Sequence, residues 1–93
     1  MVNEVRASHI LVKTESQALS LLNQIRSGSD FKEIAKRFSE CPSKKAGGDL
    51  GYFKRGMMVK EFENAAFSMN RGQVSDPVKT QFGYHIIMVT DTR

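Results

Sequence analysis

Strand-like and helix-like patterns alternate along this chain in short segments, and the whole chain has only 93 residues. A chain of that length has room for one hydrophobic core. The expected order is a strand, two helices, an irregular stretch, a strand, a helix and a final pair of strands joined as a hairpin. Interspersed elements that end in a hairpin favour an α+β fold with a mostly antiparallel sheet over a doubly wound parallel one. We therefore expect residues 1–93 to form a single α+β domain.

The first strand is expected over residues 4–12, where apolar residues occupy both alternating faces. Such a strand should be covered on both sides. Two capping-box patterns, Thr14-Glu15-Ser16-Gln17 and Asp30-Phe31-Lys32-Glu33, then predict the starts of two helices. The apolar stripe of the second helix is expected to comprise Phe31, Ile34, Ala35 and Phe38. Later elements are expected as a strand over 50–54, a helix over 59–69 and strands over 74–80 and 84–90.

Composition narrows the classes of function. Hydrophobic residues make up 40% and charged residues 26% of the chain, as in ordinary globular proteins. No stretch is apolar enough to span a bilayer, and the first residues lack the apolar core of a signal peptide. A cytoplasmic location is therefore expected, unless the chain is a domain cut from a longer secreted protein. The single cysteine cannot close an intramolecular disulfide.

The net charge of +4 comes from Lys and Arg residues that are scattered along the chain. They form no basic stripe with interleaved aromatic residues, so specific nucleic-acid binding is not expected. The charge is compatible with weak, non-specific attraction to acidic partners or an anionic membrane surface. The sequence carries no oligomerisation signal, and a monomer is expected.

The residues able to carry chemistry are few. His9 and His85, the only histidines, fall within the first and last expected strands, each on an apolar face. If these strands are neighbours, the imidazoles can share a hydrogen bond. Spacing alone favours a structural role, in which two buried histidines rigidify the sheet. Cys41 could be a nucleophile or join the histidines on zinc, although no closely spaced ligand pair is present. A packed or partly exposed inert thiol is the commoner alternative for such a residue.

An apolar pocket is a further candidate. Met58 and Phe62 are one helical turn apart, and with Leu50 they could form its walls. Ordinary core packing is the alternative for each of these residues. Composition, periodicity and spacing therefore lead to a small α+β domain with a candidate His/Cys site, and they do not name its function.

The order of several segments resembles the parvulin-type peptidyl-prolyl cis/trans isomerases across nearly the whole chain. The segments that carry the resemblance are Ala7-Ser8-His9-Ile10-Leu11-Val12-Lys13, Phe38-Ser39-Glu40-Cys41-Pro42-Ser43, Gly47-Gly48-Asp49-Leu50-Gly51-Tyr52-Phe53, Met58-Val59-Lys60-Glu61-Phe62-Glu63 and Phe82-Gly83-Tyr84-His85-Ile86-Ile87. The resemblance implies a four-stranded antiparallel sheet surrounded by three to four helices. It also implies rotation of X–Pro bonds in polypeptides, assistance to protein folding, and no cofactor or metal.

Residue roles follow from the same resemblance. Proline binding is implied for Leu50, Met58 and Phe62, with Phe82 beside them where some relatives carry Ser. The catalytic set that the resemblance implies is His9, Cys41, Thr80 and His85.

Two departures refine this picture. Val59 stands where some relatives carry Gln, which removes one polar substrate contact. Only Lys13-Thr14-Glu15 separates the first strand from the first helix, where phosphate-dependent relatives carry a long basic loop, so unphosphorylated substrates are expected. The mechanism is expected to be non-covalent, since isomerisation breaks no bond. A catalytically weak peptide-binding or chaperone module is the alternative function.

Overall fold

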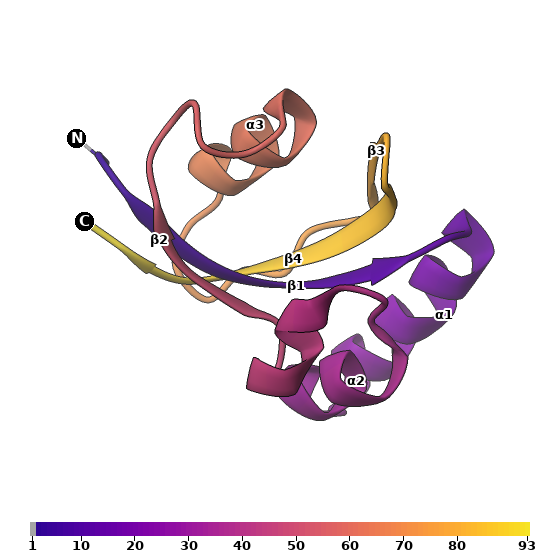
Figure 1. Ribbon diagram of the computed structural model, residues 1–93. Helices are drawn as coiled ribbons and strands as arrows, with labels where there is room; N and C mark the ends of the chain where they lie inside the picture. The colour runs from indigo at the N-terminus through magenta and orange to yellow at the C-terminus, as the bar shows by residue number, and fades with distance from the viewer. Residues whose placement is uncertain (1) are drawn as a thin grey trace.

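The computed structural model describes residues 2–93 and shows one twisted sheet with helices on both faces (Figure 1). Its four strands lie in the order β2-β1-β4-β3, and every neighbouring pair is antiparallel. This is the α+β architecture that the sequence predicts. The elements in chain order are β1 (Val5–Val12), α1 (Glu15–Arg26), α2 (Phe31–Phe38), the 3-10 helix η1 (Pro42–Ala46), β2 (Asp49–Phe53), α3 (Lys60–Ser68), β3 (Val78–Thr80) and β4 (Gly83–Thr92).

The two faces of the sheet bury separate apolar clusters. Helices α1 and α2 cover one face and α3 covers the other (Figure 1). On β1, Ile10 and Val12 contribute to the cluster under α1 and α2, while Val5 and Ala7 contribute to the cluster under α3. Because successive side chains of a strand point to opposite faces, β1 is buried on both sides, as its sequence predicts.

The first turns of α1 and α2 form only part of the predicted capping-box hydrogen bonds. The Thr14 hydroxyl accepts a hydrogen bond from the Gln17 backbone N–H at 3.2 Å, which confirms Thr14 as the N-cap. Within residues 2–93, however, Gln17 makes no side-chain bond back to Thr14, and Asp30 caps α2 without a side-chain bond. The prediction that Phe38 joins the buried stripe of α2 is also wrong, because its residue stays 40% exposed at the C-terminal end of that helix.

The first strand of the last hairpin, β3, is shorter than the stretch 74–80 that the sequence predicts. Strand β3 covers three residues, and Val74 meets β4 only through an isolated bridge to Met88. Pro77 lies between these two contacts and has no N–H to donate to a ladder. In this stretch the Ser75 hydroxyl accepts from the Ile87 N–H at 2.9 Å instead. Within the described range, no helix has the length and apolar character needed to cross a membrane.

Candidate active site

An apolar groove of about 500 Å³ opens on the face of the sheet that α3 covers. It brings together residues that are far apart in sequence and that belong to β1, β2, β4, α3 and the connecting segments. Its lining includes every proposed proline-binding residue and every proposed catalytic residue except Thr80, which lies behind His85. The lining residues are His9, Leu11, Glu40, Cys41, Pro42, Leu50, Met57, Met58, Val59, Phe62, Phe82 and His85.

Two buried imidazoles belong to the lining of this groove. Strands β1 and β4 are neighbours, and the Nδ1 atoms of His9 and His85 are 2.9 Å apart. The rings are 18° from parallel, with centroids 5.1 Å apart. The Thr80 Oγ1 atom lies 2.7 Å from the other ring nitrogen of His85, Nε2. The hydrogen bond that the sequence allows between the histidines is thus confirmed, and Thr80 extends it.

Counting donors and acceptors assigns a direction to this chain of bonds. The Phe82 N–H donates to Thr80 Oγ1 at 3.1 Å, so the Thr80 hydroxyl proton is free to donate to His85 Nε2. The second nitrogen of His85 then carries its proton and donates to His9 Nδ1. His9 must hold its own proton on Nε2, which is buried and has no partner among residues 2–93. In the opposite direction, His85 Nε2–H would donate to Thr80, and the Thr80 hydroxyl proton would then have no acceptor among residues 2–93. We therefore assign the direction from Thr80 through His85 to His9.

Burial keeps both histidines neutral. Desolvation, together with the neighbouring His85, lowers the pKa of His9 to about 4. Burial also lowers the pKa of His85. A proton added to either ring would place charge in an apolar environment and remove an acceptor from the chain of bonds. At neutral pH the site therefore presents two uncharged imidazoles.

Aromatic packing joins the histidines to the groove wall. The Phe62 ring stands nearly perpendicular to both imidazoles, at 82° to His9 and 81° to His85, with centroids 5.6 and 5.4 Å away. The Phe62 ring also packs against the Phe53 ring, with centroids 5.9 Å apart. Phe62 is only 3% exposed, and it contributes to the core as well as to the groove. Phe62 therefore both lines the groove and packs in the core, which the sequence left as alternatives.

Comparison with known proteins identifies this arrangement. Residues 6–91 match the family described as "Rotamase: PPIC-type PPIASE domain". The chain belongs to this family. It is a PpiC-type peptidyl-prolyl cis/trans isomerase domain, which is the parvulin resemblance stated from the sequence.

Relatives place the domain among longer and shorter proteins. It is 55% identical to foldase protein PrsA 1 of Bacillus cereus over 97% of this chain and 32% of that protein. The crystal structure of peptidylprolyl isomerase PrsA from Bacillus anthracis superposes with a TM-score of 0.97 at 46% identity, covering 99% of this chain and 43% of that one. The solution structure of NmPin, the parvulin of Nitrosopumilus maritimus, gives 0.87 at 47% identity, covering 98% and 99%. The chain thus spans about a third of the length of the curated PrsA relatives it matches.

Two residues of this PpiC-type domain that the sequence analysis did not single out, Ser39 and Gly48, fix the backbone around Cys41 and His9. The buried Ser39 hydroxyl accepts hydrogen bonds from the Leu11 N–H at 3.0 Å and the Cys41 N–H at 3.4 Å. Nearby, the Gly48 carbonyl accepts from the His9 N–H at 2.9 Å. Gly48 has φ +88°, and a Cβ there would lie 2.4 Å from the His9 carbonyl oxygen. A glycine is therefore required for this close approach.

The exposed rim of the groove was only partly predicted. Phe82 lies at the rim and is 59% exposed, whereas Met57, which is 65% exposed, was not singled out. The only signal for Met57 was its position next to Met58 in the turn before α3. As for metals, no three His, Cys, Asp or Glu side chains in the described chain gather as ligands. The histidines turn their Nδ1 atoms toward each other instead.

Proposed function

We propose that this domain accelerates cis/trans isomerisation of X–Pro bonds in unphosphorylated polypeptides and thereby assists their folding. The observation that carries the proposal is an apolar groove that adjoins a buried, neutral imidazole pair. A prolyl ring is apolar and has no N–H, so it suits such a groove. The polar atoms beside it can act on the peptide bond that precedes the ring.

The reaction needs rotation, and no covalent bond has to form or break. Amide resonance sets a barrier of about 18–20 kcal/mol to rotation about the C–N bond. Only contacts that are stronger with the twisted amide than with the planar amide lower this barrier. We propose that Leu50, Met58 and Phe62 hold the prolyl ring while the preceding carbonyl rotates. Leu50 and Met58 are partly buried and pack against the same cluster as Phe62, which makes this part of the groove firm.

The histidines, Thr80 and Cys41 are proposed to shape the polar side of the groove. Because the pKa of His9 is about 4, the imidazole pair is poorly suited to exchange protons with a substrate near neutral pH. Its proposed role is to hold β1 and β4 in register beneath the groove and to present an uncharged, weakly hydrated surface. Cys41 lines the groove at the start of η1, and its proposed contribution is polar contact without covalent attack.

Charge at the rim supports a preference for unphosphorylated substrates. Among the lining residues, Glu40 supplies a charged side chain, a carboxylate that is exposed and lies 3.8 Å from the Lys13 ammonium. A phosphate beside the proline would approach this carboxylate, whose charge the exposed, 3.8 Å contact with Lys13 offsets only weakly. The sequence places no basic loop after β1 to offset the repulsion between these negative charges.

A peptide-binding module with weak turnover is the second candidate. The observation in its favour is that Phe82 and Met57 leave large apolar surfaces exposed at the rim. Such surfaces can retain apolar polypeptide segments whether or not a prolyl bond rotates.

Exchange NMR on an unphosphorylated X–Pro peptide separates the two candidates. With a catalytic amount of the domain, we expect faster cis/trans exchange, which a bulky Met58→Trp substitution abolishes. The matched phosphopeptide should be turned over less well. A folded domain that broadens peptide lines without raising the exchange rate would favour the binding module and overturn the proposed catalysis.

Residues 1–93 are proposed to suffice for this activity. Support comes from NmPin, a chain that this domain matches over 99% of its length. The monomeric state and the cytoplasmic location stay predictions. Sedimentation of the purified chain and fractionation of cells that express the natural protein test them.

A further inference from the structure

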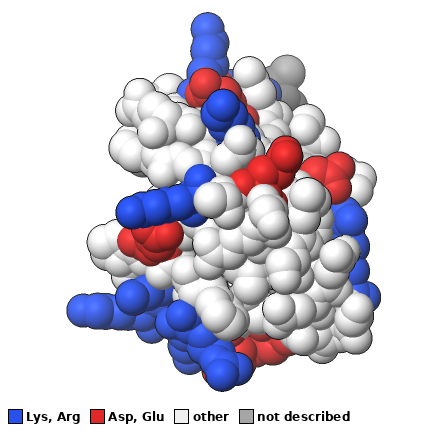
Figure 2. Space-filling model, turned by 90° about the vertical axis from the view of Figure 1, so that its right-hand side faces the viewer, with Lys and Arg blue, Asp and Glu red and all other residues white. Residues whose placement is uncertain are grey.

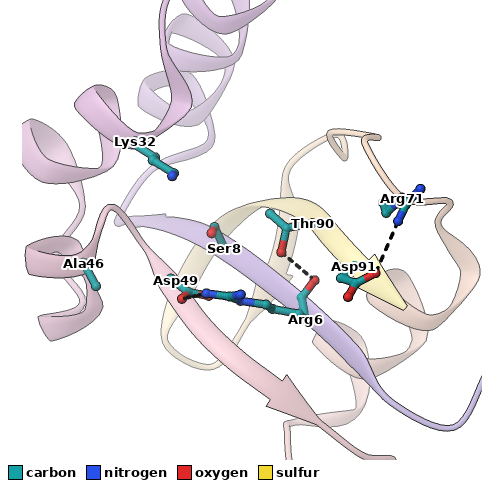
Figure 3. A pocket seen from close by; sticks show the side chains of 8 residues that line it. All are labelled: Arg6, Ser8, Lys32, Ala46, Asp49, Arg71, Thr90 and Asp91. Carbon is teal, nitrogen blue, oxygen red and sulfur yellow. Dashed lines mark hydrogen bonds and ion pairs between the residues drawn. The ribbon is translucent and has the colours of Figure 1, made fainter. Parts of the chain in front are cut away.

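A second cavity, of about 360 Å³, lies on the opposite face of the sheet from the groove. Ser8 contributes to its floor, and its neighbour His9 lines the groove on the other face, as strand alternation requires. Figure 3 shows Lys32 of α2 and Ala46 of η1 on one side of this space and Arg71 of the α3–β3 loop on the other. We call it the back pocket.

The charges around the back pocket do not cancel. Arg6 donates to both carboxylate oxygens of Asp49, at 3.2 and 2.7 Å. Asp91 accepts from the Tyr52 hydroxyl and lies 3.5 Å from the Arg71 guanidinium. Lys32 has no ion-pair partner within residues 2–93 and leaves the pocket with one positive charge in excess.

A hydroxyl that lines the same cavity lies beside this cation. Ser8 is only 2% exposed, lines the back pocket and makes no side-chain hydrogen bond to any described residue. In Figure 3 the Ser8 hydroxyl and the Lys32 ammonium point toward the same space. Because the Ser8 hydroxyl is not one of the fully buried atoms that lack a partner, which are His9 Nε2 and Ser43 Oγ, it meets the space of the cavity and can donate to a group that enters it.

We infer that the back pocket binds a carboxylate of an acidic polypeptide segment. Lys32 supplies the charge and Ser8 the hydrogen-bond donor, while Arg71 contributes from the facing wall. A carboxylate carries one negative charge, which matches the excess in the pocket. A phosphate dianion would instead add uncompensated charge beside Asp49 and Asp91.

The surroundings favour an extended acidic partner. The exposed residues Lys36, Arg37, Lys44 and Lys45 lie on α2 and η1, which also supply Lys32 and Ala46 to the pocket. In Figure 2 the largest group of Lys and Arg side chains in view lies at the lower end, the level at which Figure 1 draws α2 and η1. An acidic segment seated in the back pocket would continue across this basic surface.

This inference rests on the proposed function in one respect, which is that the acidic segment belongs to a polypeptide whose proline occupies the groove. The substrate would then be held on both faces of the sheet. Acidic, proline-containing unfolded chains would be bound more tightly than neutral ones, and the chemistry at the proline would stay the same.

The binding test uses a proline-free peptide with several Asp residues and blocked ends, and a matched peptide with Asn in place of Asp. We expect saturable amide NMR shifts at Ser8, Lys32 and Arg71 with the Asp peptide only, and none at Leu50 or Phe62. Lys32→Gln should weaken binding by about three- to tenfold and Ser8→Ala by about threefold. Lys79→Gln, an equal change of charge on β3, should weaken it by less than about twofold.

Other probes can overturn this assignment. If inorganic phosphate shifts the same amides with equal or higher affinity, the pocket is a general anion site. If vesicles of anionic lipid bind in a Lys32-dependent way and the Asp peptide does not, the partner is a membrane surface. If neither the peptide nor the vesicles respond to Lys32→Gln, the back pocket binds no acidic partner.

A kinetic test links the pocket to catalysis. The substrate is a proline peptide joined by a flexible spacer to the Asp segment, compared with the short peptide alone. Lys32→Gln should raise KM for the long substrate and leave its kcat and all constants of the short substrate unchanged. If the wild-type domain turns over neither substrate, the proposed function fails, and the binding test still decides the back pocket.

Discussion

Strand β1 presents two different environments through neighbouring residues. On the α3 face, His9 is buried, uncharged and joined to His85 and Thr80 by hydrogen bonds. On the other face, Arg6 and Asp49 form an ion pair whose side chains remain 46% and 29% exposed. The polar atoms of the first face are shielded from water, whereas those of the second remain in contact with it.

This difference determines what each face tolerates. A buried polar atom that loses its partner bears the full cost of desolvation, while an exposed one regains water. The α3 face should therefore be sensitive to side-chain shape and to protonation. The back pocket should be sensitive mainly to salt and to net charge. The groove residues would then contribute to stability and to turnover together, and the back-pocket residues to partner binding alone.

The largest effect is expected for Phe62→Ala. This change removes a buried ring that packs against both imidazoles and Phe53. It should lower the free energy of unfolding by about 3–5 kcal/mol in urea titrations. Turnover measured by exchange NMR should be lost under conditions in which the variant remains folded.

A matched control for Phe62→Ala lies in the other apolar cluster. Leu22 is 1% exposed and packs under α1 and α2. Leu22→Ala should cost about 2–5 kcal/mol and leave turnover per folded molecule unchanged. Equal loss of turnover in both variants would mean that the two faces are not functionally distinct.

Acid should destabilise the α3 face next most strongly. The pKa of His9 falls from an ordinary 6.5 to about 4 on folding, so between these values the unfolded chain binds more protons than the folded one. Stability should be fully present above pH 6.5 and should decline as the pH falls toward about 4, by about 3 kcal/mol from His9 alone. Urea titrations across this range measure the decline. A His9→Asn variant should show a flatter profile, and an unchanged profile would contradict the link.

Thr80→Val tests the direction assigned to the hydrogen bonds. Without the hydroxyl, His85 Nε2 and the Phe82 N–H both lose their partner. We expect a loss of about 1–3 kcal/mol in the free energy of unfolding. Thr80→Ser keeps the oxygen and should recover most of this loss. In ¹⁵N NMR spectra of the imidazoles, wild type should show the proton on His9 Nε2 and on His85 Nδ1.

The sequence predicted the residues that line the groove better than the residues that hold its backbone by hydrogen bonds. Local periodicity placed His9 and His85 on apolar faces, and the resemblance brought Leu50, Met58 and Phe62 into one set. Ser39 and Gly48 were missed because their roles depend on contacts with Leu11 and His9, far away in the chain. The back pocket was missed for the same reason, since Ser8, Lys32 and Arg71 share no local pattern. Phe38 shows the opposite error: the helical stripe predicted its burial, but it is the last residue of α2 and stays 40% exposed.

A smaller effect is expected for Cys41→Asp. Cys41 is partly exposed at the groove and would make no covalent bond in the proposed reaction. The variant should keep exchange activity within about tenfold of wild type, which corresponds to about 1.4 kcal/mol. Complete loss in a folded variant would contradict the non-covalent role. A Cys41→Ser variant separates loss of the thiol from addition of charge.

The smallest effect is expected on the back face, for Arg6→Gln. The Arg6 side chain is 46% exposed, and its hydrogen bond holds the pKa of the Asp49 carboxyl below its usual range. Its removal should shift the urea midpoint slightly at low salt and not at all in about 1 M salt, where charges several ångströms apart are screened. Thr80→Val should show no such salt dependence, because its lost bonds are buried and uncharged. If Arg6→Gln instead destabilises the protein equally at both salt concentrations, the back face depends on packing as the α3 face does, and the contrast between the two faces disappears.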